Sequence, residues 1–479
     1  MTPSETAPPF VPTGLSNGAL HPARKLSLRE ALDSARETKA LYVGQNLVRR
    51  IPAIFREQFP RRRAAVVADP ASFSVAGQGA ADLLGNSDLA GAQPFVFHDP
   101  DLYAEHRYVE ELERAFRSHN AIPVAVGSGT INDLVKLAAH RVGRPYLCVA
   151  TAASMDGYTA FGASITYQNA KQTFDCPAPQ VVIADLDVVC AAPASMTAAG
   201  YADLQAKITA GADWILADAL QVEPIDPRAW EIVQGGLRDA LADPAGAHAG
   251  RPAAIAPLIE GLMLGGFAMQ WSKSSRPASG AEHQFSHLWD MEHHTFRGEA
   301  PSHGFKVGVA TLAVAALYEQ LLQQPIDQLD VAACCARWPE PAEIETRVQQ
   351  LFAANDFLPT ALAEIRAKHP SHVELRSQLE RLRSIWPALR ERLRAQLVPH
   401  AELKRRLQIV GAPTEPEEIG LTRERLRDSF LRAQHIRRRF TVLDLVSRTD
   451  LLTPSLHALF GPGGIWEISS TPNLKHPSA

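Results

Sequence analysis

The segment "IPVAVGSGTINDLVKLAAHRVG", residues 122–143, joins an apolar β-strand to an amphipathic helix that starts at about Ile131. The turn between them contains Gly127, Ser128 and Gly129. Glycines let the backbone approach a bound group, and the free N–H groups and dipole of a helix N-terminus favour negative charge. The turn matches neither the G-x-G-x-x-G nor the Walker A pattern. It therefore predicts a phosphate or pyrophosphate site, with a plain tight βα loop as the equally open alternative.

Short β-rich runs alternate with helical stretches around this segment, from about residue 40 to residue 190. The runs are "KALYVG", "AAVVAD", "PFVFHD", "IPVAVG", "PYLCVAT" and "QVVIADLDVV". This alternation predicts a parallel, Rossmann-like sheet built from βαβ units. After Pro193 the pattern is helical, and apolar residues recur every three or four positions between Leu375 and Leu393. We expect Pro387 to kink that helix.

The expected organisation is therefore an α/β N-terminal domain followed by an all-α C-terminal domain. We place a polar extension at residues 1–29, the α/β domain at 30–192 and the helical domain at 193–479. A cleft between two such domains is a common place for a ligand.

Two further features lie where predicted strands end, which is where open α/β sheets bind ligands. The stretch "ATAASMDGYTAFGAS" follows the strand that ends near Thr151. Asp69 ends the strand "AAVVAD", where it could accept hydrogen bonds from an adenosine ribose, although a turn-forming role before Pro70 is equally plausible.

Composition excludes few ligand classes. The chain has 479 residues, 46% of them hydrophobic, and a formal charge of -4, so nothing in the net charge favours nucleic acid or an anionic membrane as a partner.

The beginning of the chain lacks a signal-peptide pattern, and a cytoplasmic location is expected. The apolar run at 307–318 is too short to cross a bilayer and predicts a buried helix. The five cysteines show no CxxC spacing and predict neither disulfides nor a zinc knuckle.

The histidines cluster in "SGAEHQFSHLWDMEHH" (279–294) and "PSHGFKVG" (301–308). His283 and His287 are four residues apart and share one helix face, while His303 opens the next apolar helix, so two helices can converge on one point. Two imidazoles and a carboxylate suit zinc, nickel or iron(II). Asp203, in "GYADLQAKITAGADW", is a candidate third ligand, although spacing alone does not single it out.

The motifs "GSGTINDLVK", "TAASMDGYT", "GYADLQAKITAGADW", "SSRPASGAEHQFSH" and "SHGFKVGVAT" occur in an order that resembles the sn-glycerol-1-phosphate dehydrogenase family, in particular its longer bacterial, arabinose-operon type. The resemblance runs from about residue 30 to about residue 450. It implies membership of the superfamily of dehydroquinate synthase and the iron-type alcohol dehydrogenases, and hence a dehydroquinate synthase-like fold with a nicotinamide dinucleotide-binding domain and a metal- and substrate-binding domain.

The same resemblance implies roles for individual residues. The metal ligands would be Asp203, His283 and His303. Asp203 would also touch substrate and count as catalytic, together with His287, the substrate-facing histidine. Asp156 would bind substrate. The cofactor contacts that it implies are Gly127, Ser128, Gly129, Thr130, Ile131, Thr151, Ala152, Ala153 and Ser154. Asp69 joins this set only through its position at a strand end.

Some positions depart from the family pattern or are left without a role. Ser128 interrupts the usual glycines, and Ala160 replaces a serine that bonds the cofactor, so NAD or NADP preference is open. His293 and His294 are expected at the surface or in a loop. Lys207 and Arg276 are candidate partners of the substrate phosphate, although a surface position is the more expected one for each.

The implied activity is the metal-dependent interconversion of dihydroxyacetone phosphate and sn-glycerol 1-phosphate with NAD(H) or NADP(H) and one divalent ion, zinc or nickel. The alternatives are a dehydrogenase of an unphosphorylated polyol such as glycerol, a dehydroquinate synthase-like lyase, and a binding protein without turnover. The expected partner is a phosphorylated triose, with no nucleic acid or membrane, and we expect a homodimer.

Overall fold

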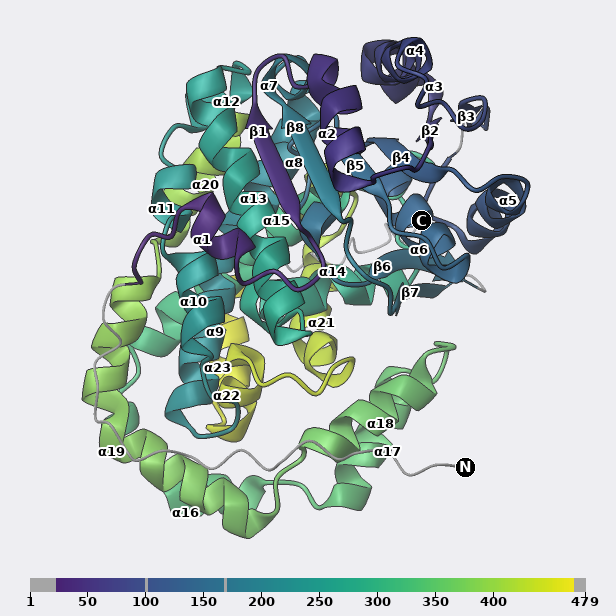
Figure 1. Ribbon diagram of the computed structural model, residues 1–479. Helices are drawn as coiled ribbons and strands as arrows, with labels where there is room; N and C mark the ends of the chain where they lie inside the picture. The colour runs from purple at the N-terminus through teal and green to yellow at the C-terminus, as the bar shows by residue number, and fades with distance from the viewer. Residues whose placement is uncertain (1–22, 100–101, 168–169, 469–479) are drawn as a thin grey trace, which may run out of the picture.

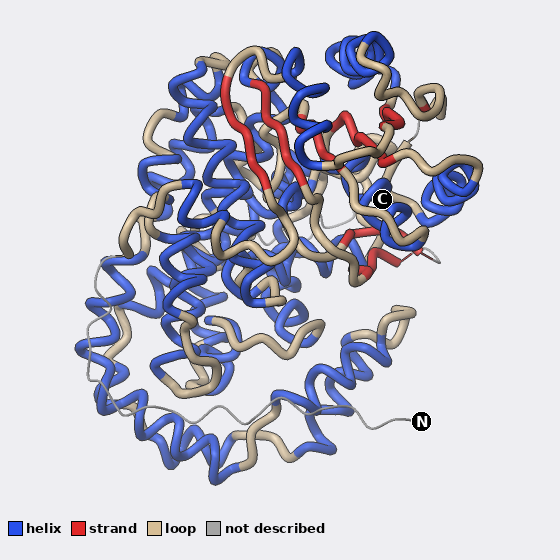
Figure 2. Tube along the Cα trace, in the orientation of Figure 1, coloured by secondary structure: helices blue, strands red, loops and turns tan. Residues whose placement is uncertain are grey.

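A computed structural model describes residues 23–99, 102–167 and 170–468. Six parallel strands lie in the first part of the chain, and helices make up nearly everything after them (Figures 1 and 2). This confirms the predicted fold class. Residues 1–22 of the predicted extension lie outside the described residues, and helix α1 (Leu28–Leu32) begins before that extension was expected to end.

The strand order of the sheet is β1-β8-β5-β4-β2-β3, and all neighbours are parallel. Each predicted β-rich run contains one strand: β1 (Ala40–Gly44), β2 (Ala64–Ala68), β3 (Phe95–Val96), β4 (Ile122–Gly127), β5 (Leu147–Ala150) and β8 (Val181–Asp185). Gly127 pairs with Ala150, and Ala150 pairs with Ala184. The carboxyl ends of β4, β5 and β8 are therefore level, and the segments that follow them lie at one edge of the sheet.

Helices cover both faces of the sheet because successive side chains of each strand point to opposite sides. Val124 and Val126 of β4 pack with α2 (Ile51–Gln58) and α4 (Gln78–Asn86). Ala125, between them, packs on the other side with α5 and α6. The remaining helices of this part are α3 (Pro70–Ser72), α5 (His106–Arg117), α6 (Gly129–Arg141) and α7 (Leu186–Val189).

An antiparallel hairpin of β6 (Ala163–Tyr167) and β7 (Ala170–Phe174) was not predicted. It lies outside the parallel sheet, as a separate two-stranded unit. Ala163 and Ile165 of β6 are fully buried and alternate with partly exposed residues, so the period-2 signal was present but short.

Beyond Asp185 the described residues form helices and connecting segments, without a further strand. The helices are α8 (Ala194–Gln205), α9 (Lys207–Ala219), α10 (Pro227–Gln234), α11 (Leu237–Ala240), α12 (Pro244–His248), α13 (Pro252–Ser272), α14 (Ala281–Met291), α15 (His303–Leu322), α16 (Val331–Arg337), α17 (Pro341–Leu351), α18 (Leu358–Lys368), α19 (His372–Gln396), α20 (His400–Val410), α21 (Arg423–Arg432), α22 (Val442–Arg448) and α23 (Leu452–Phe460). We keep residue 193 as the proposed start of the second domain, since it precedes α8.

Helices α13 and α15 are long and apolar enough to span a membrane by length and composition alone. The helix predicted from the run at 307–318 is therefore longer than expected. Both helices are mostly buried inside the protein, α15 more than α13. Helix α15 packs between α8 and α14, and its burial accounts for its nearly continuous apolar sequence.

Helix α19 runs along the outside of the helical part and leads to the group of α16, α17 and α18 at the bottom of Figure 1. The apolar face predicted for it is buried at each position: Leu375, Leu379, Leu382, Trp386, Leu389 and Leu393. Pro387 lies inside this helix, which continues past it to Gln396.

Candidate active site

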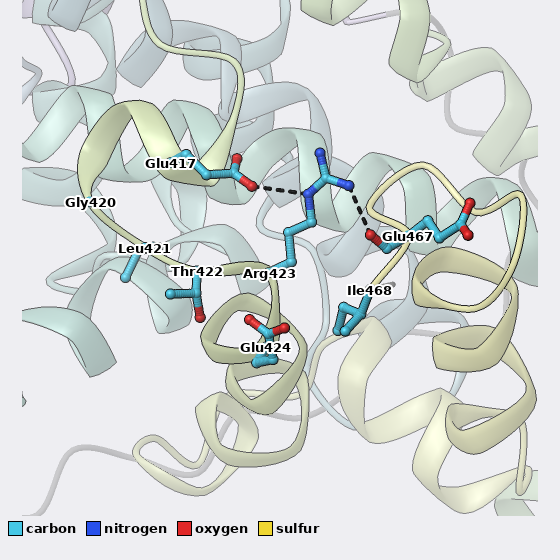
Figure 3. Close-up of a pocket in the computed structure, with 8 residues that line it drawn as sticks. All are labelled: Glu417, Gly420, Leu421, Thr422, Arg423, Glu424, Glu467 and Ile468. Carbon is cyan, nitrogen blue, oxygen red and sulfur yellow. Dashed lines mark hydrogen bonds and ion pairs between the residues drawn. The ribbon is translucent and has the colours of Figure 1, made fainter. Parts of the chain in front are cut away.

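A cavity of about 840 Å³ lies at the carboxyl edge of the sheet, bordered by the start of α6, the loop after β5, the β6–β7 hairpin and helices α14 and α15. Its lining includes Ser128, Gly129 and Thr130 from the glycine turn, and His283, His287 and His303. A second groove, lined by residues 417, 420–424, 467 and 468, offers a different set of side chains (Figure 3). There Arg423 already donates to Glu417 and to the backbone oxygen of Glu467, and none of the groove's residues is a histidine or cysteine.

Three side chains form a compact set of possible metal ligands at the cavity, two of them in its lining and Asp203 buried behind it. Asp203 on α8, His283 on α14 and His303 at the start of α15 each offer one ligand atom, and these atoms lie within 4.8 Å of one another. The closest carboxylate oxygen of Asp203 is 3.7 Å from Nε2 of His283. His287 lies beside this set, with ring centroids 6.3 Å from His283 and 6.2 Å from His303. One carboxylate and two imidazoles at this spacing fit a divalent metal that keeps open positions.

Two glycines bring the helices close enough for this cluster to form. A Cβ atom on Gly304 would lie 2.0 Å from the backbone oxygen of Ala199 on α8, so the start of α15 rests directly on that helix. Gly200, the next residue of α8, makes the same kind of contact with the backbone oxygen of Ala153 in the loop after β5. Any side chain at either glycine would force these backbones apart. Helix α8 thus holds both His303 and the loop at fixed distances from Asp203.

Glu282, which the sequence analysis did not single out, is fully buried behind His283. Its Oε1 lies 2.8 Å from His283 Nδ1 and accepts a hydrogen bond from the Gly280 N–H, while its Oε2 accepts one from the Thr209 hydroxyl. Burial would raise the pKa of Glu282, but these donors hold it below its usual value. A carboxylate at Nδ1 leaves Nε2 of His283 as the nitrogen for a metal. The signal available in the sequence was only an acidic residue next to a candidate ligand.

Lys207 is fully buried, which contradicts the surface position expected for it. Its Nζ is 2.8 Å from Asp156 Oδ2 and 2.8 Å from Asp203 Oδ1. Burial opposes the charge of Lys207, but the two carboxylates raise its pKa above the usual value. In turn, burial would raise the pKa of Asp203, and the charges of Lys207 and the neighbouring histidines lower it instead. The backbone N–H of Asp156 also donates to Asp203, at 3.0 Å.

The glycine turn presents the start of α6 to the cavity. Ser128 precedes the helix in an extended conformation, and no side chain caps the first turn. A Cβ atom on Gly127 would lie 2.6 Å from Ile131, so a glycine is required for the helix to turn back against β4. Free N–H groups at such a helix start can receive a phosphate.

The other predicted cofactor residues take different positions. Ser154 lines the cavity beside Met155 and Asp156. Gly127, Ile131, Thr151, Ala152 and Ala153 are buried and lie behind the residues that line it. Asp69 caps α3 by accepting a hydrogen bond from the Ser72 N–H at 2.9 Å. It is not part of the cavity lining, and its contact with a ribose stays a prediction.

Lys136 was also missed from sequence. It is buried on α6, and its Nζ donates to the backbone oxygens of Gly157, Ala160 and Gly162 at 2.9 to 3.0 Å. It therefore fixes the loop that carries Asp156 to the helix that carries the glycine turn. A lysine in an amphipathic helix gives no sign of such inward contacts.

His293 is exposed, and His294 lies in the loop after α14, as expected for a surface or loop residue, although its side chain is buried. Its Nε2 lies 2.7 Å from the Ile419 oxygen, and Arg425 bonds its Nδ1. Arg276 is buried, which contradicts the surface position expected for it, and it donates to the backbone oxygens of Phe440 and Asp213. Both side chains hold segments of the helical part together, and Arg276 does not line the cavity.

The fold is shared with solved glycerol dehydrogenases, and part of the chain matches a profile of iron-containing alcohol dehydrogenases. A profile described as "Iron-containing alcohol dehydrogenase" matches residues 42–193. The fold resembles a probable glycerol dehydrogenase of Sinorhizobium meliloti, with a TM-score of 0.55 and 16% identity over 87% of this chain and 96% of that one. It also resembles a glycerol dehydrogenase of Schizosaccharomyces pombe, with a TM-score of 0.56 and 14% identity over 88% and 90%.

Relatives with higher sequence identity to this chain identify its family. The glycerol-1-phosphate dehydrogenase [NAD(P)+] of Halalkalibacterium halodurans is 33% identical over 61% of this chain and 73% of its own. That of Geobacillus stearothermophilus is 28% identical over 84% of this chain and 91% of its own. The chain belongs to the glycerol-1-phosphate dehydrogenase family.

Proposed function

We propose that this protein is an NAD(P)-dependent, metal-dependent oxidoreductase that interconverts dihydroxyacetone phosphate and sn-glycerol 1-phosphate. The observation that carries the proposal is one cavity that joins the uncapped start of α6 to the cluster of Asp203, His283 and His303. The relatives are named for glycerol 1-phosphate and NAD(P)+, which supports the substrate and the cofactor. The alternative of an unphosphorylated polyol gains no comparable support, since the glycerol dehydrogenases resemble this chain in fold alone.

Asp203, His283 and His303 would hold one divalent ion, for which zinc and nickel are our candidates. When bound, this ion supplies a Lewis acid next to the oxygen on substrate C2, where negative charge develops during hydride transfer. Glu282 contributes by fixing the orientation of the His283 ring.

The chain's own groups would prepare substrate and cofactor for the transfer. The N–H groups at Ser128, Gly129 and Thr130 would receive the dinucleotide pyrophosphate, which places the nicotinamide towards the histidines. Asp156 and His287, both in the cavity lining, would bind the substrate hydroxyls. His287 is partly exposed to the cavity and would pass the proton of the reacting hydroxyl towards solvent. Lys207 would hold Asp156 in place, and its charge opposes the rise in the pKa of Asp156 that burial and Asp203 cause.

Replacing the histidines one at a time tests these roles. His283→Ala and His303→Ala should lower bound metal and activity together. His287→Ala should keep about one metal ion per chain and lose activity by about 10²-fold or more, the usual scale for a positioned proton-transfer group. His457→Ala is the control, because this exposed histidine on α23 lies outside the cavity lining, and it should change neither quantity.

Metal content by elemental analysis, read beside turnover of the same preparations, decides the assignment. A site emptied by His287→Ala but left full by His303→Ala would refute it. Turnover should be measured with zinc and nickel supplied separately and with both NADH and NADPH. We expect kcat/KM to be at least about tenfold higher for dihydroxyacetone phosphate than for dihydroxyacetone, since a charge-assisted hydrogen bond to phosphate is worth roughly 1.5 to 3 kcal/mol. Equal turnover of the two would move the chain to the polyol class.

A further inference from the structure

One wall of the cavity, away from the glycine turn, combines two hydroxyls with a guanidinium. Ser275 and Ser279, from the loop before α14, and Arg437, from the extended segment before α22, all line the cavity. Ser279 lies directly before Gly280, the residue that precedes α14, and His283 lies in the first turn of that helix. Ser279 is thus four residues before His283, at the start of the same helix, and both line one cavity, so a small ligand held at the histidine cluster can reach this wall.

Arg437 differs from the other cations near the cavity. Within the described part of the chain, no hydrogen bond or ion pair engages its side chain. Burial lowers the pKa of Arg437, and the charge of Glu364 opposes that effect. An arginine stays charged under these conditions, so its positive charge faces the cavity without a counterion in contact. By contrast, Arg276 is occupied by Phe440, Asp213 and Glu223, and Lys306 pairs with Asp290.

Arg439 orients the two serines. Its guanidinium donates to the Ser279 hydroxyl oxygen at 2.6 Å and to the Ser275 hydroxyl oxygen at 2.9 Å. A guanidinium cannot accept a hydrogen bond, so each serine still has its own O–H to donate. Neither O–H donates to an acceptor among the residues that the structure describes. Both hydroxyls are therefore available as donors at the cavity wall, and the charge of Arg439 behind them makes them better donors to an anion.

We propose that Ser275, Ser279 and Arg437, with Arg439 as the positioning residue behind the serines, form the subsite for the phosphate group of the substrate. A phosphate monoester offers several acceptor oxygens around one centre, which matches two hydroxyl donors and a guanidinium fork. The subsite rests on the proposed function for the identity of its ligand, a triose phosphate. It replaces Arg276 and Lys207 as phosphate partners, since both are engaged elsewhere.

The test compares Arg437→Ala with Arg438→Ala in the metal-loaded enzyme. Arg438 is the matched control, because its exposed side chain pairs with Glu364 at the surface. With saturating reduced cofactor, Arg437→Ala should lower kcat/KM for dihydroxyacetone phosphate by about tenfold to a hundredfold, the loss of a charge-assisted bond to phosphate. The value for dihydroxyacetone should change by less than about twofold. Arg437→Lys should recover part of the loss, and Arg438→Ala should match the unaltered protein.

Phosphate binding provides a second readout that does not depend on turnover. Inorganic phosphate should bind the unaltered protein and Arg438→Ala alike, and Arg437→Ala about tenfold or more weakly, by calorimetric titration. Equal losses for both substrates, or equal phosphate binding by Arg437→Ala and the unaltered protein, would overturn the subsite. If the unaltered protein does not prefer the phosphorylated triose, the proposed function fails, and the phosphate titration alone then decides the subsite. Metal content and melting temperature are measured for each variant to detect a folding defect. If Arg437→Ala proves misfolded, the same measurements are made on Arg437→Lys and Ser279→Ala instead.

Discussion

Replacing Glu282 by glutamine should weaken metal binding while preserving the fold. The glutamine Oε1 can keep the bonds from the Gly280 N–H and from His283, and its amide N–H can donate to the Thr209 hydroxyl, so the local geometry survives. What is lost is the negative charge 2.8 Å from His283 Nδ1. The difference between a charge-assisted and a neutral hydrogen bond is about 1 to 2 kcal/mol, which corresponds to roughly tenfold in metal affinity.

The measurement is competition for zinc against a chromophoric chelator, with melting temperature recorded on the same samples. Thr209→Val is the matched control, because it removes a bond to Glu282 Oε2 and leaves the contact between Glu282 and His283 intact. We expect it to change zinc affinity by less than about threefold, since it leaves the Glu282 carboxylate and its contact with His283 in place. Unchanged zinc affinity in a folded Glu282→Gln variant, or a larger loss in Thr209→Val, would refute the role given to Glu282.

Three further changes test other parts of the molecule. Gly129→Val should give a folded protein that binds NADH and NADPH about tenfold more weakly by fluorescence titration. The reason is that the new side chain would reach Met155 and cover the start of α6. Unchanged binding would contradict the assignment of the glycine turn to the cofactor. Lys207→Met should lower the free energy of unfolding of the metal-stripped protein by about 3 to 5 kcal/mol in urea, because it leaves Asp156 and Asp203 buried without their cation; a change below 1 kcal/mol speaks against this pairing. Burial and the charge of Lys368 lower the pKa of His435 from 6.5 to about 3, so the unfolded chain takes up this proton first as pH falls, and stability is lost from about pH 6.5 downwards. His435→Phe should therefore lose about 2 kcal/mol less than the unaltered protein between pH 7 and pH 5, and equal losses in chemical denaturation would exclude His435 as a source of acid sensitivity.

The sequence was sufficient for features that depend on local periodicity. The six parallel strands follow from short β-rich runs that alternate with helical stretches, and the buried face of α19 follows from a pattern of period 3.6. The proximity of His283 and His303 could also be predicted from the sequence, because one lies on a helix face and the other at the start of the next helix. Asp203 required the resemblance to a family, since no spacing relation links α8 to α14.

What sequence could not reveal is the inward direction of charged side chains. Lys207, Arg276 and Lys136 have the composition of a helix or loop surface, yet each is buried against partners far away in the chain. Their burial is possible only because carboxylates or backbone oxygens from other elements meet them. Arg437 escaped notice because it belongs to a run of three arginines, residues 437–439, and only its place in the cavity lining distinguishes it.

The glycine contacts of α8 limit which walls of the cavity can move when ligands enter and leave. Gly200 and Gly304 place three backbones in direct contact, so the distance between the loop after β5 and the start of α15 is set by the thickness of the polypeptide itself. This spacing cannot widen without moving His303 away from Asp203 and from the loop after β5. We expect entry and release of ligands to take place through the other walls, the β6–β7 hairpin and the segment at 293–302, which also line the cavity. Substitutions in those walls should then change the rate of product release, while the alignment of the reacting groups stays as it is.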